Sequence, residues 1–198
     1  SSEISEPHEA ILQFFIAGYV RLAKTKNTIR KGRAVKRRTN MGLPRTFVGF
    51  SSTDIHCYRL MTAWKENEKI DFDFTDCQLD GEINSDNEDY IKRKCRERIN
   101  LAGKFVMLIG KDTKSKHKYV RWEAEVAIEK GCTIIGVNLD GTRQVNEDLC
   151  PPIIRGIGAI FVPFSPQIIK YAIENYKMHD SGNYHYTPEV YKQLGYGG

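Results

Sequence analysis

From residue 45 onward, short apolar runs alternate with longer segments whose apolar positions recur every three or four residues. Four largely apolar runs predict buried strands, at residues 46–50, 105–109, 133–137 and 158–162. Residues 70–74 alternate apolar and polar positions, which predicts a half-exposed edge strand. The amphipathic segments predict helices at residues 55–65, 89–103, 119–130 and 166–176. Strands and helices in this order predict a mostly parallel sheet with helices on both faces.

This pattern predicts a flavodoxin-like α/β fold of five strands in the order 2-1-3-4-5. In such a sheet, ligands bind beyond the carboxyl ends of the strands, at the switch point beside the first strand. The chain divides into an N-terminal helix and basic linker (1–44), the α/β domain (45–178) and a polar, tyrosine-rich C-terminal tail (179–198). The tail is too polar for a core element, so we expect a loosely packed extension or disorder.

Positive charge is concentrated before residue 46. The chain carries +5 overall, but ten of its 30 basic residues lie between Arg21 and Arg45, where no acid occurs. After Arg45, 20 basic residues face 22 acidic ones, and this near-neutral balance argues against a nucleic-acid-binding face on the domain. We interpret residues 7–23 as a helix packed on its own domain or on a second copy, and residues 24–38 as a solvated linker. The alternative is a polybasic tether to a membrane, nucleic acid or a partner.

Cysteine usage and hydropathy predict a cytoplasmic protein. The five cysteines are scattered without a CxxC pair, which is typical of a reducing compartment and indicates no zinc or other metal site. No run approaches the ~20 apolar residues of a membrane span. The N-terminus starts with acidic residues, unlike a secretory signal. We therefore expect no membrane span.

One carboxylate on the third helix of the domain is a candidate for chemistry. Tyr119 and Glu123 are four residues apart, so ring and carboxylate lie one above the other near the N-terminal end of the helix. That end faces the carboxyl edge of the sheet, where a carboxylate can meet a ligand. The simpler alternative is a solvated glutamate favoured by the helix dipole. We interpret Glu125 and Glu129, on other faces of the helix, as surface charge.

Motifs exclude several functions that flavodoxin-like folds support. A phosphoacceptor receiver needs an aspartate after the third strand and a lysine after the fifth, where Gly110 and Pro163 stand. The turn at residues 51–54 has no glycine for a flavin phosphate. The GxxxxGK[ST] and GxGxxG motifs are absent, and the five histidines fit no Ser/His/Asp arrangement. What remains is Glu123, a hydroxyl-rich turn after the first strand and a polar loop after the second.

Residues 45–178 resemble the TIR-like domains of prokaryotic antiphage defence, in particular the Thoeris type. The resemblance rests on residues 46–51 (TFVGFS) with Asp54, on 105–110 (FVMLIG), and above all on 119–123 (YVRWE) followed by 128–131 (IEKG) and 134–136 (IIG). It implies a flavodoxin-like fold and, for enzymatic members, cleavage of the nicotinamide–ribose bond of NAD. NAD is then a substrate rather than a cofactor. Some members cyclise or conjugate the ADP-ribose product, which activates a partner effector.

The resemblance also implies site residues. The catalytic glutamate of the family falls four residues after an aromatic, and Glu123 matches it, with Tyr119 where a tryptophan is usual. One carboxylate suffices, because nicotinamide leaves as a neutral molecule and a carboxylate can stabilise or capture the oxocarbenium-like ribose. The implied substrate contacts are aromatic walls from Phe50 and Tyr119, ribose or phosphate contacts from Ser51, Ser52 and Asp54, and a closing loop that begins at Thr75 and Asp76.

Other interpretations remain open at this point. A non-catalytic TIR-type module would assemble with other copies, through the TIR-like domain or the N-terminal helix, or with a partner. A nucleoside-processing transferase would use a comparable sheet and carboxylate. The expected contacts also have structural alternatives, with Phe50 as a core ring, residues 51–54 as a helix cap and Asp76 as a turn residue.

Overall fold

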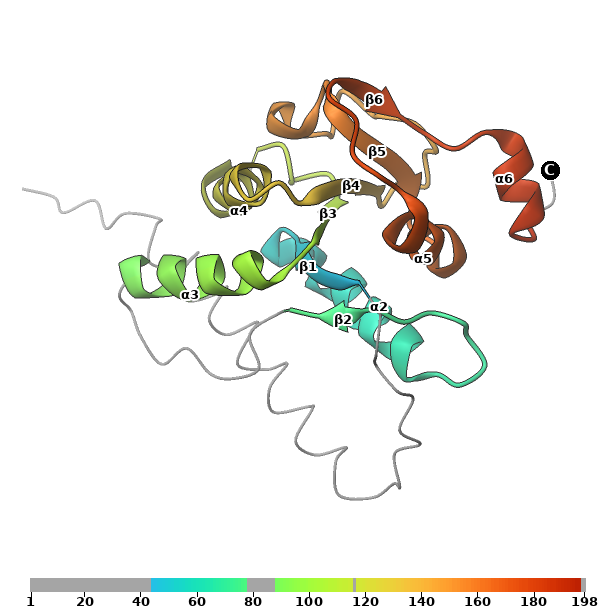
Figure 1. Ribbon diagram of the computed structural model, residues 1–198, viewed down its shortest axis with the longest axis horizontal. Coiled ribbons are helices and arrows are strands. Elements are labelled where there is room, and N and C mark those ends of the chain that lie inside the picture. The colour runs from blue at the N-terminus through green and yellow to red at the C-terminus, as the bar shows by residue number, and fades with distance from the viewer. Residues whose placement is uncertain (1–43, 78–87, 116, 197–198) are drawn as a thin grey trace, which may run out of the picture.

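The computed structural model describes residues 44–77, 88–115 and 117–196 (Figure 1). At positions 88, 91 and 117–119 only the backbone is described. The expected N-terminal helix, the basic linker and most of the polar loop after Asp76 lie outside these residues. Apart from residue 116, the rest of the predicted α/β domain is described.

The six strands in the described part of the chain form one parallel sheet in the order β2-β1-β3-β4-β5-β6. Their bounds are β1 Arg45–Gly49, β2 Thr75–Asp76, β3 Lys104–Ile109, β4 Thr133–Asn138, β5 Ile157–Pro163 and β6 Gly182–Tyr184. The α/β class and the predicted order 2-1-3-4-5 are confirmed, and β6 extends the sheet by one strand. Because β1 and β3 are neighbours, the turns that follow them lie at the same edge of the sheet.

Helices cover both faces of this sheet (Figure 1). The α-helices are α2 Ile55–Glu66, α3 Glu88–Leu101, α4 His117–Glu129, α5 Pro166–Asn175 and α6 Pro188–Gln193, and two 3-10 turns lie at η1 Ser52–Asp54 and η2 Pro152–Ile154. Side chains of α3 and α4 bury one face of the sheet, and side chains of α2, α5 and α6 bury the other. The four predicted helices are confirmed to within two residues at each end.

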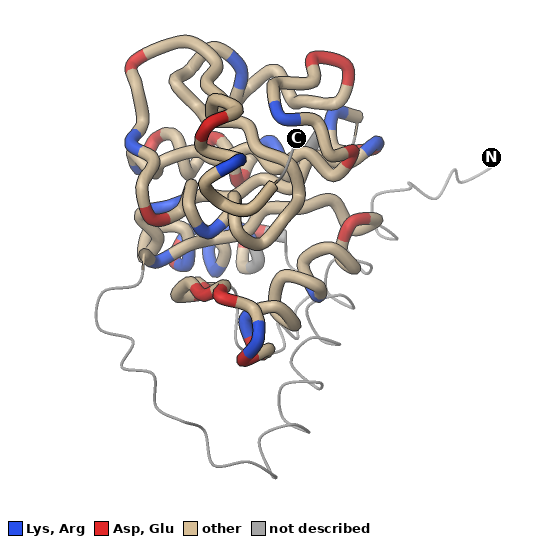
Figure 2. Tube along the Cα trace, turned by 90° about the vertical axis from the view of Figure 1, so that its right-hand side faces the viewer, with Lys and Arg blue, Asp and Glu red and all other residues tan. Residues whose placement is uncertain are grey.

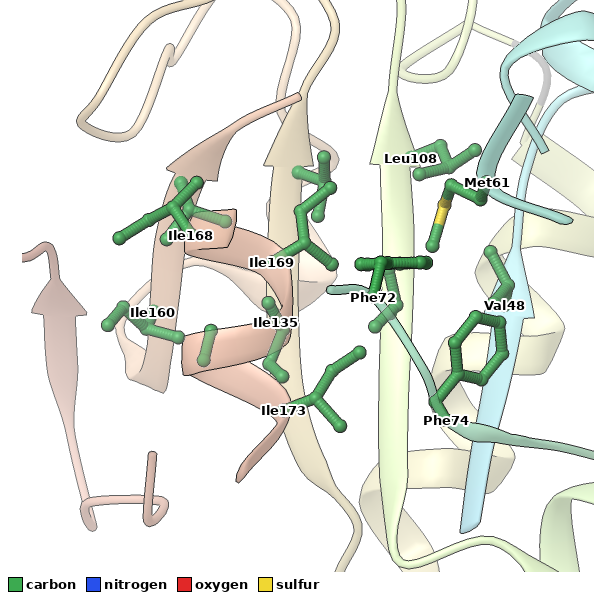
Figure 3. Packing of buried hydrophobic residues seen from close by; sticks show 14 of the residues in the cluster. Val48, Met61, Phe72, Phe74, Leu108, Ile135, Ile160, Ile168, Ile169 and Ile173 are labelled. Atoms are coloured by element: carbon green, nitrogen blue, oxygen red, sulfur yellow. The ribbon is translucent and has the colours of Figure 1, made fainter. Parts of the chain in front are cut away.

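Alternate residues of the strands supply the two cores. Figure 3 shows the core on the α2/α5 face, in which Val48, Leu108, Ile135 and Ile160 of the strands meet Met61 of α2 and Ile168, Ile169 and Ile173 of α5. Successive strand residues point to opposite faces of a sheet. Phe47, Phe105 and Phe161 therefore fill the second core, against α3 and α4. This division by face decides which side chains can reach the candidate site.

Residues 70–74 are buried in alternation but do not form a strand. Both phenylalanines of this segment are fully buried on the α2/α5 face, yet the ladder with β1 starts only where Thr75 pairs with Arg45. The preceding residues have no partner in β1, because β1 begins at Arg45. The carbonyl of Phe74 instead accepts a hydrogen bond from Lys65 Nζ at 2.6 Å. The predicted edge strand at 70–74 is therefore wrong, and the edge strand is the two-residue β2.

The tyrosine-rich tail is a folded part of the domain, so the expectation of a loose or disordered extension is wrong for residues 179–196. β6 pairs with β5, and Tyr191 of α6 is only 1% exposed, within the core of α2 and α5. The Tyr196 hydroxyl binds Ser165 and Gln167 at the start of α5. Tyrosine rings provide large buried areas while their hydroxyls can keep polar contacts. A segment with few aliphatic residues can thus still pack firmly.

Charged positions of both signs are interspersed over the described part of the chain (Figure 2). Some of them pair, such as Lys170 with Asp71 and Arg121 with Glu125, each at 2.8 Å. This mixture agrees with the near-neutral balance after Arg45. Among the helices that the structure describes, none has the length and hydropathy required to span a membrane.

Candidate functional site

Glu123 lies at the carboxyl end of β1, on the face of the sheet that α3 and α4 cover. Helix α4 packs Val120, Ala124 and Ala127 against the sheet, and Glu123 shares this helix face. The Glu123 side chain is only 3% exposed. Its Oε2 atom lies 3.1 Å from the position that a Cβ on Gly49 would occupy. The structure therefore places a buried carboxyl group at the switch point beside β1.

The surroundings of Glu123 favour its neutral form. Burial raises the pKa of Glu123 to about 8. Helix α3 contributes Cys95, which is 5% exposed, and burial together with the nearby Glu123 charge raises the pKa of its thiol. A carboxyl group in such a place ionises readily only when a cation arrives beside it. Strongly perturbed, buried carboxyl groups are concentrated at functional sites, although structural groups can share this property.

Gly49 is part of this arrangement, although the sequence did not mark it as a site residue. A Cβ at position 49 would lie 2.7 Å from Phe105 Cζ, well inside van der Waals contact, besides crowding the Glu123 carboxyl group. Glycine is the residue that permits such a close approach to the backbone. The available signal was a glycine within an apolar strand, which often marks a point of close contact.

The turn after β1 brings the Asp54 carboxylate onto the end of β3. Ser51 is 1% exposed, and its hydroxyl lies 2.9 Å from Thr53 Oγ1. Asp54 is 9% exposed, and its oxygens lie 2.4 and 2.6 Å from the position that a Cβ on Gly110 would occupy. Thr113, which the sequence did not indicate, lies 3.5 Å from Asp54 Oδ2 through its hydroxyl oxygen. Glu123 and Asp54 thus occupy the carboxyl ends of two neighbouring strands.

Phe50 belongs to the opposite face of the sheet from Glu123. It is 4% exposed, lies in the α2/α5 core and stacks on Tyr58 with ring centroids 4.9 Å apart. The Tyr58 hydroxyl donates a hydrogen bond of 2.7 Å to Asp76 Oδ2. The ring of Phe50 is therefore a core ring in this structure and does not line the surroundings of Glu123.

Thr75 and Asp76 lie away from the turn at residues 51–54. They form β2 and pair with Arg45 and Thr46 at the start of β1, whereas residues 51–54 follow its carboxyl end. The expectation that these two residues begin a loop is wrong, because they are strand residues, and residues 78–87, over which the predicted loop continues, lie outside the described part of the chain. Asp76 instead joins β2 to α2 through Tyr58.

Tyr119 lies in α4 one turn before Glu123, as predicted, but its side chain is outside the description. Of the other predicted site residues, Ser51, the half-buried Ser52 and Asp54 gather at the carboxyl edge of β1 and β3. Across the described residues, no group of three or more His, Cys, Asp or Glu side chains could hold a metal ion. The described residues at this edge contribute carboxyl groups, from Glu123 and Asp54 among others, and several hydroxyls.

Comparison with known proteins agrees with this geometry. Residues 47–144 match the family model described as the Thoeris protein ThsB, TIR-like domain. No curated protein matches the chain. The matched residues include most of β1, the turn that carries Asp54, and the whole of α4 with Glu123. On this match and on its flavodoxin-like sheet, the chain belongs to the Thoeris-type TIR-like proteins.

Proposed function

We propose that this protein is an enzyme of antiphage defence that cleaves the nicotinamide–ribose bond of NAD, with Glu123 as its catalytic residue. The observation that carries the proposal is the buried Glu123 carboxyl group against Gly49, at the carboxyl end of β1. Ligands of open α/β sheets bind at this position. The ADP-ribose-type product, linear or cyclic, would serve as a signal to an effector protein.

The chemistry requires one carboxylate rather than the usual pair. As the bond between ribose C1′ and the pyridinium nitrogen breaks, its electron pair stays with nitrogen, and nicotinamide leaves neutral. The ribose becomes an oxocarbenium-like cation, which ionised Glu123 stabilises electrostatically or captures as an ester. Water then adds at C1′ and releases one proton, which gives ADP-ribose. A nucleophile on the same molecule would instead give a cyclic product.

Activity should rise with pH in the range where free Glu123 ionises. Because burial raises the pKa of Glu123 to about 8, kcat/KM for NAD should increase from about pH 6, reach half its maximum near pH 8 and level off above about pH 9, as this parameter reports the free enzyme. The midpoint for kcat should be lower, since the positive nicotinamide ring of bound NAD favours the carboxylate. Initial rates of nicotinamide release across this range provide the measurement. A flat kcat/KM profile would show that Glu123 ionisation does not limit the reaction.

Glu123→Gln should reduce nicotinamide release by at least about 100-fold, because the amide keeps the shape of the side chain but cannot balance the charge of the ribose cation. The measurement is nicotinamide and product detection by mass spectrometry after incubation with NAD, with nucleosides tested in parallel. The matched control is Glu125→Gln, which changes an exposed pair with Arg121 on the same helix and should leave the rate unchanged. Nicotinamide release that survives Glu123→Gln would remove the assignment of this residue.

The second candidate function is a non-catalytic TIR-type assembly module. The burial of Glu123 favours this module, because a side chain that is only 3% exposed offers little surface to a substrate in this conformation. The NAD assay separates the two functions when it is run at increasing protein concentration and with crowding agents. Absence of nicotinamide release under all these conditions, with concentration-dependent association in light scattering, would favour the assembly module.

A further inference from the structure

Glu123 is closed off from solvent in this structure, although the proposed reaction needs NAD to reach its carboxylate. The side chain is 3% exposed, so an element around it has to move before a substrate can enter. Strands β1 and β3 lie inside the sheet, with a paired strand on either side of each, and α4 carries Glu123 itself. Among the described elements that surround the glutamate, α3 is the one left to move, and its buried Cys95 lies near Glu123.

The C-terminal end of α3 is fixed to the edge of the sheet opposite the site, where the helix runs into β3 (Figure 1). The Gly103 N–H donates a hydrogen bond of 2.9 Å to Arg45 O, and the Gly103 carbonyl accepts one of 3.0 Å from the Thr133 N–H. The Cys132 thiol donates to Ala102 O at 3.4 Å. Arg45 and Thr133 begin β1 and β4, so these bonds tie α3 to the amino edge. Small residues at the end of an element often serve as hinges, so α3 can turn about Ala102 and Gly103 while this end stays attached.

The middle of α3 is held against α4 by a contact between a charge and a ring. The guanidinium of Arg96 lies over the ring of Trp122, 5.9 Å from its centroid. Arg96 is exposed, and Trp122, which directly precedes Glu123, is half-buried. Cation–π contacts at exposed sites are weak. Opening α3 at this point breaks the weak contact and exposes the small side chain of Cys95, so the movement has a low cost.

We propose that α3 is a hinged cover over Glu123, that the contact between Arg96 and Trp122 holds it closed, and that NAD reaches the carboxylate when α3 swings away from α4. The identity of the substrate rests on the proposed function. In the closed state Glu123 is shielded and NAD is not consumed. A ligand that binds the open state better than the closed one shifts the population towards the open state, and NAD is itself such a ligand.

The rate at which iodoacetamide labels Cys95 reports the opening of α3, because a buried thiol with a raised pKa reacts only once it reaches water. Arg96→Ala should raise this rate, and kcat/KM for NAD, by roughly two- to fivefold, the effect of losing one cation–π contact. Arg96→Lys keeps the charge and should raise both by less. Peptide mapping by mass spectrometry, after labelling of the folded full-length protein, follows each cysteine separately.

Arg93→Ala is the matched control, because it removes a cation–π contact of the same kind that stays within α3. The Arg93 guanidinium lies over the ring of Tyr90, 5.1 Å from its centroid. Its loss should leave Cys95 labelling and kcat/KM unchanged. Cys57 lies in the α2/α5 core and should be labelled at the wild-type rate in every variant, since only global unfolding would expose it together with Cys95.

Unchanged Cys95 labelling in Arg96→Ala, an equal rise in Arg93→Ala, or a parallel rise at Cys57 would overturn the proposal. Faster Cys95 labelling with unchanged kcat/KM in an active enzyme would overturn it too, since access to Glu123 would then not depend on α3. The labelling measurement does not require cleavage. If Arg96→Ala opens α3 selectively and neither it nor the wild type releases nicotinamide, the hinged cover stands and only the proposed reaction is rejected.

Discussion

Glu123→Gln is expected to stabilise the folded protein, and by much more at pH 9 than at pH 5. In the folded chain, burial raises the pKa of Glu123 to about 8 from its usual value of 4.5. Neutral Glu123 therefore contributes stability that is fully present below pH 4.5 and is lost as the pH rises through about 8. The pH-dependent loss is on the order of 4 kcal/mol in the free energy of unfolding. Glutamine does not titrate and avoids this loss.

Urea unfolding of the wild type and of Glu123→Gln at about pH 5, 7 and 9 checks this expectation, with the slope m compared to confirm that the unfolded states are alike. Glu125→Gln is the control, since its partly exposed carboxylate should shift stability by less than about 0.5 kcal/mol at every pH. A stability difference that does not change with pH would show that Glu123 does not carry a raised pKa. A higher free energy of unfolding for Glu123→Gln than for the wild type would mean that the protein retains a destabilising acid, as functional sites commonly do.

The position of Glu123 could be inferred from the sequence because helical spacing fixes which residues share a face. Val120, Ala124 and Ala127 define the buried face of α4, and Glu123 falls on it at the end of the helix near the sheet edge. Strands β1, β3, β4 and β5 could also be predicted from the sequence, since each contains a largely apolar run that is buried on both faces of the sheet. Local periodicity was sufficient for these features.

Phe50 shows where the same argument was incomplete. Side chains alternate across a strand, so Gly49 and Phe50 must point to opposite faces of the sheet. Once Glu123 is placed on the α3/α4 face beside Gly49, Phe50 has to lie in the α2/α5 core. The period of two in the strand could have excluded Phe50 as a wall next to the glutamate.

The contacts of Asp54 depend on information that local patterns do not contain. Gly110 and Thr113 lie more than 50 residues from Asp54, and the three meet only because β3 is the neighbour of β1. Likewise, β2 and β6 have two and three residues, too few for a periodic signal, and they exist as strands only through pairing with β1 and β5. Long-range pairing, rather than propensity, determines these elements.

Tyr191→Ala is expected to cost about 3 kcal/mol of unfolding free energy, which is the effect of removing a large buried ring from a core. Tyr191 is 1% exposed, contacts the ring of Tyr196 with centroids 5.9 Å apart and lies under the Arg143 guanidinium at 4.3 Å. Its hydroxyl is buried and has no hydrogen-bond partner among the described residues. This unmet hydroxyl keeps the expected loss at the lower end of the range for aromatic residues.

Chemical denaturation of three variants separates a packed tail from a loosely attached one. Tyr191→Phe removes only the unpartnered hydroxyl, so its stability should equal or slightly exceed that of the wild type. Tyr184→Ala removes a ring that is 37% exposed on β6 and should cost less than Tyr191→Ala, at roughly 1 kcal/mol. If Tyr191→Ala cost no more than Tyr184→Ala, α6 would not be part of the core. The large difference expected between these two tyrosines follows from the way α6 closes the core formed by α2 and α5.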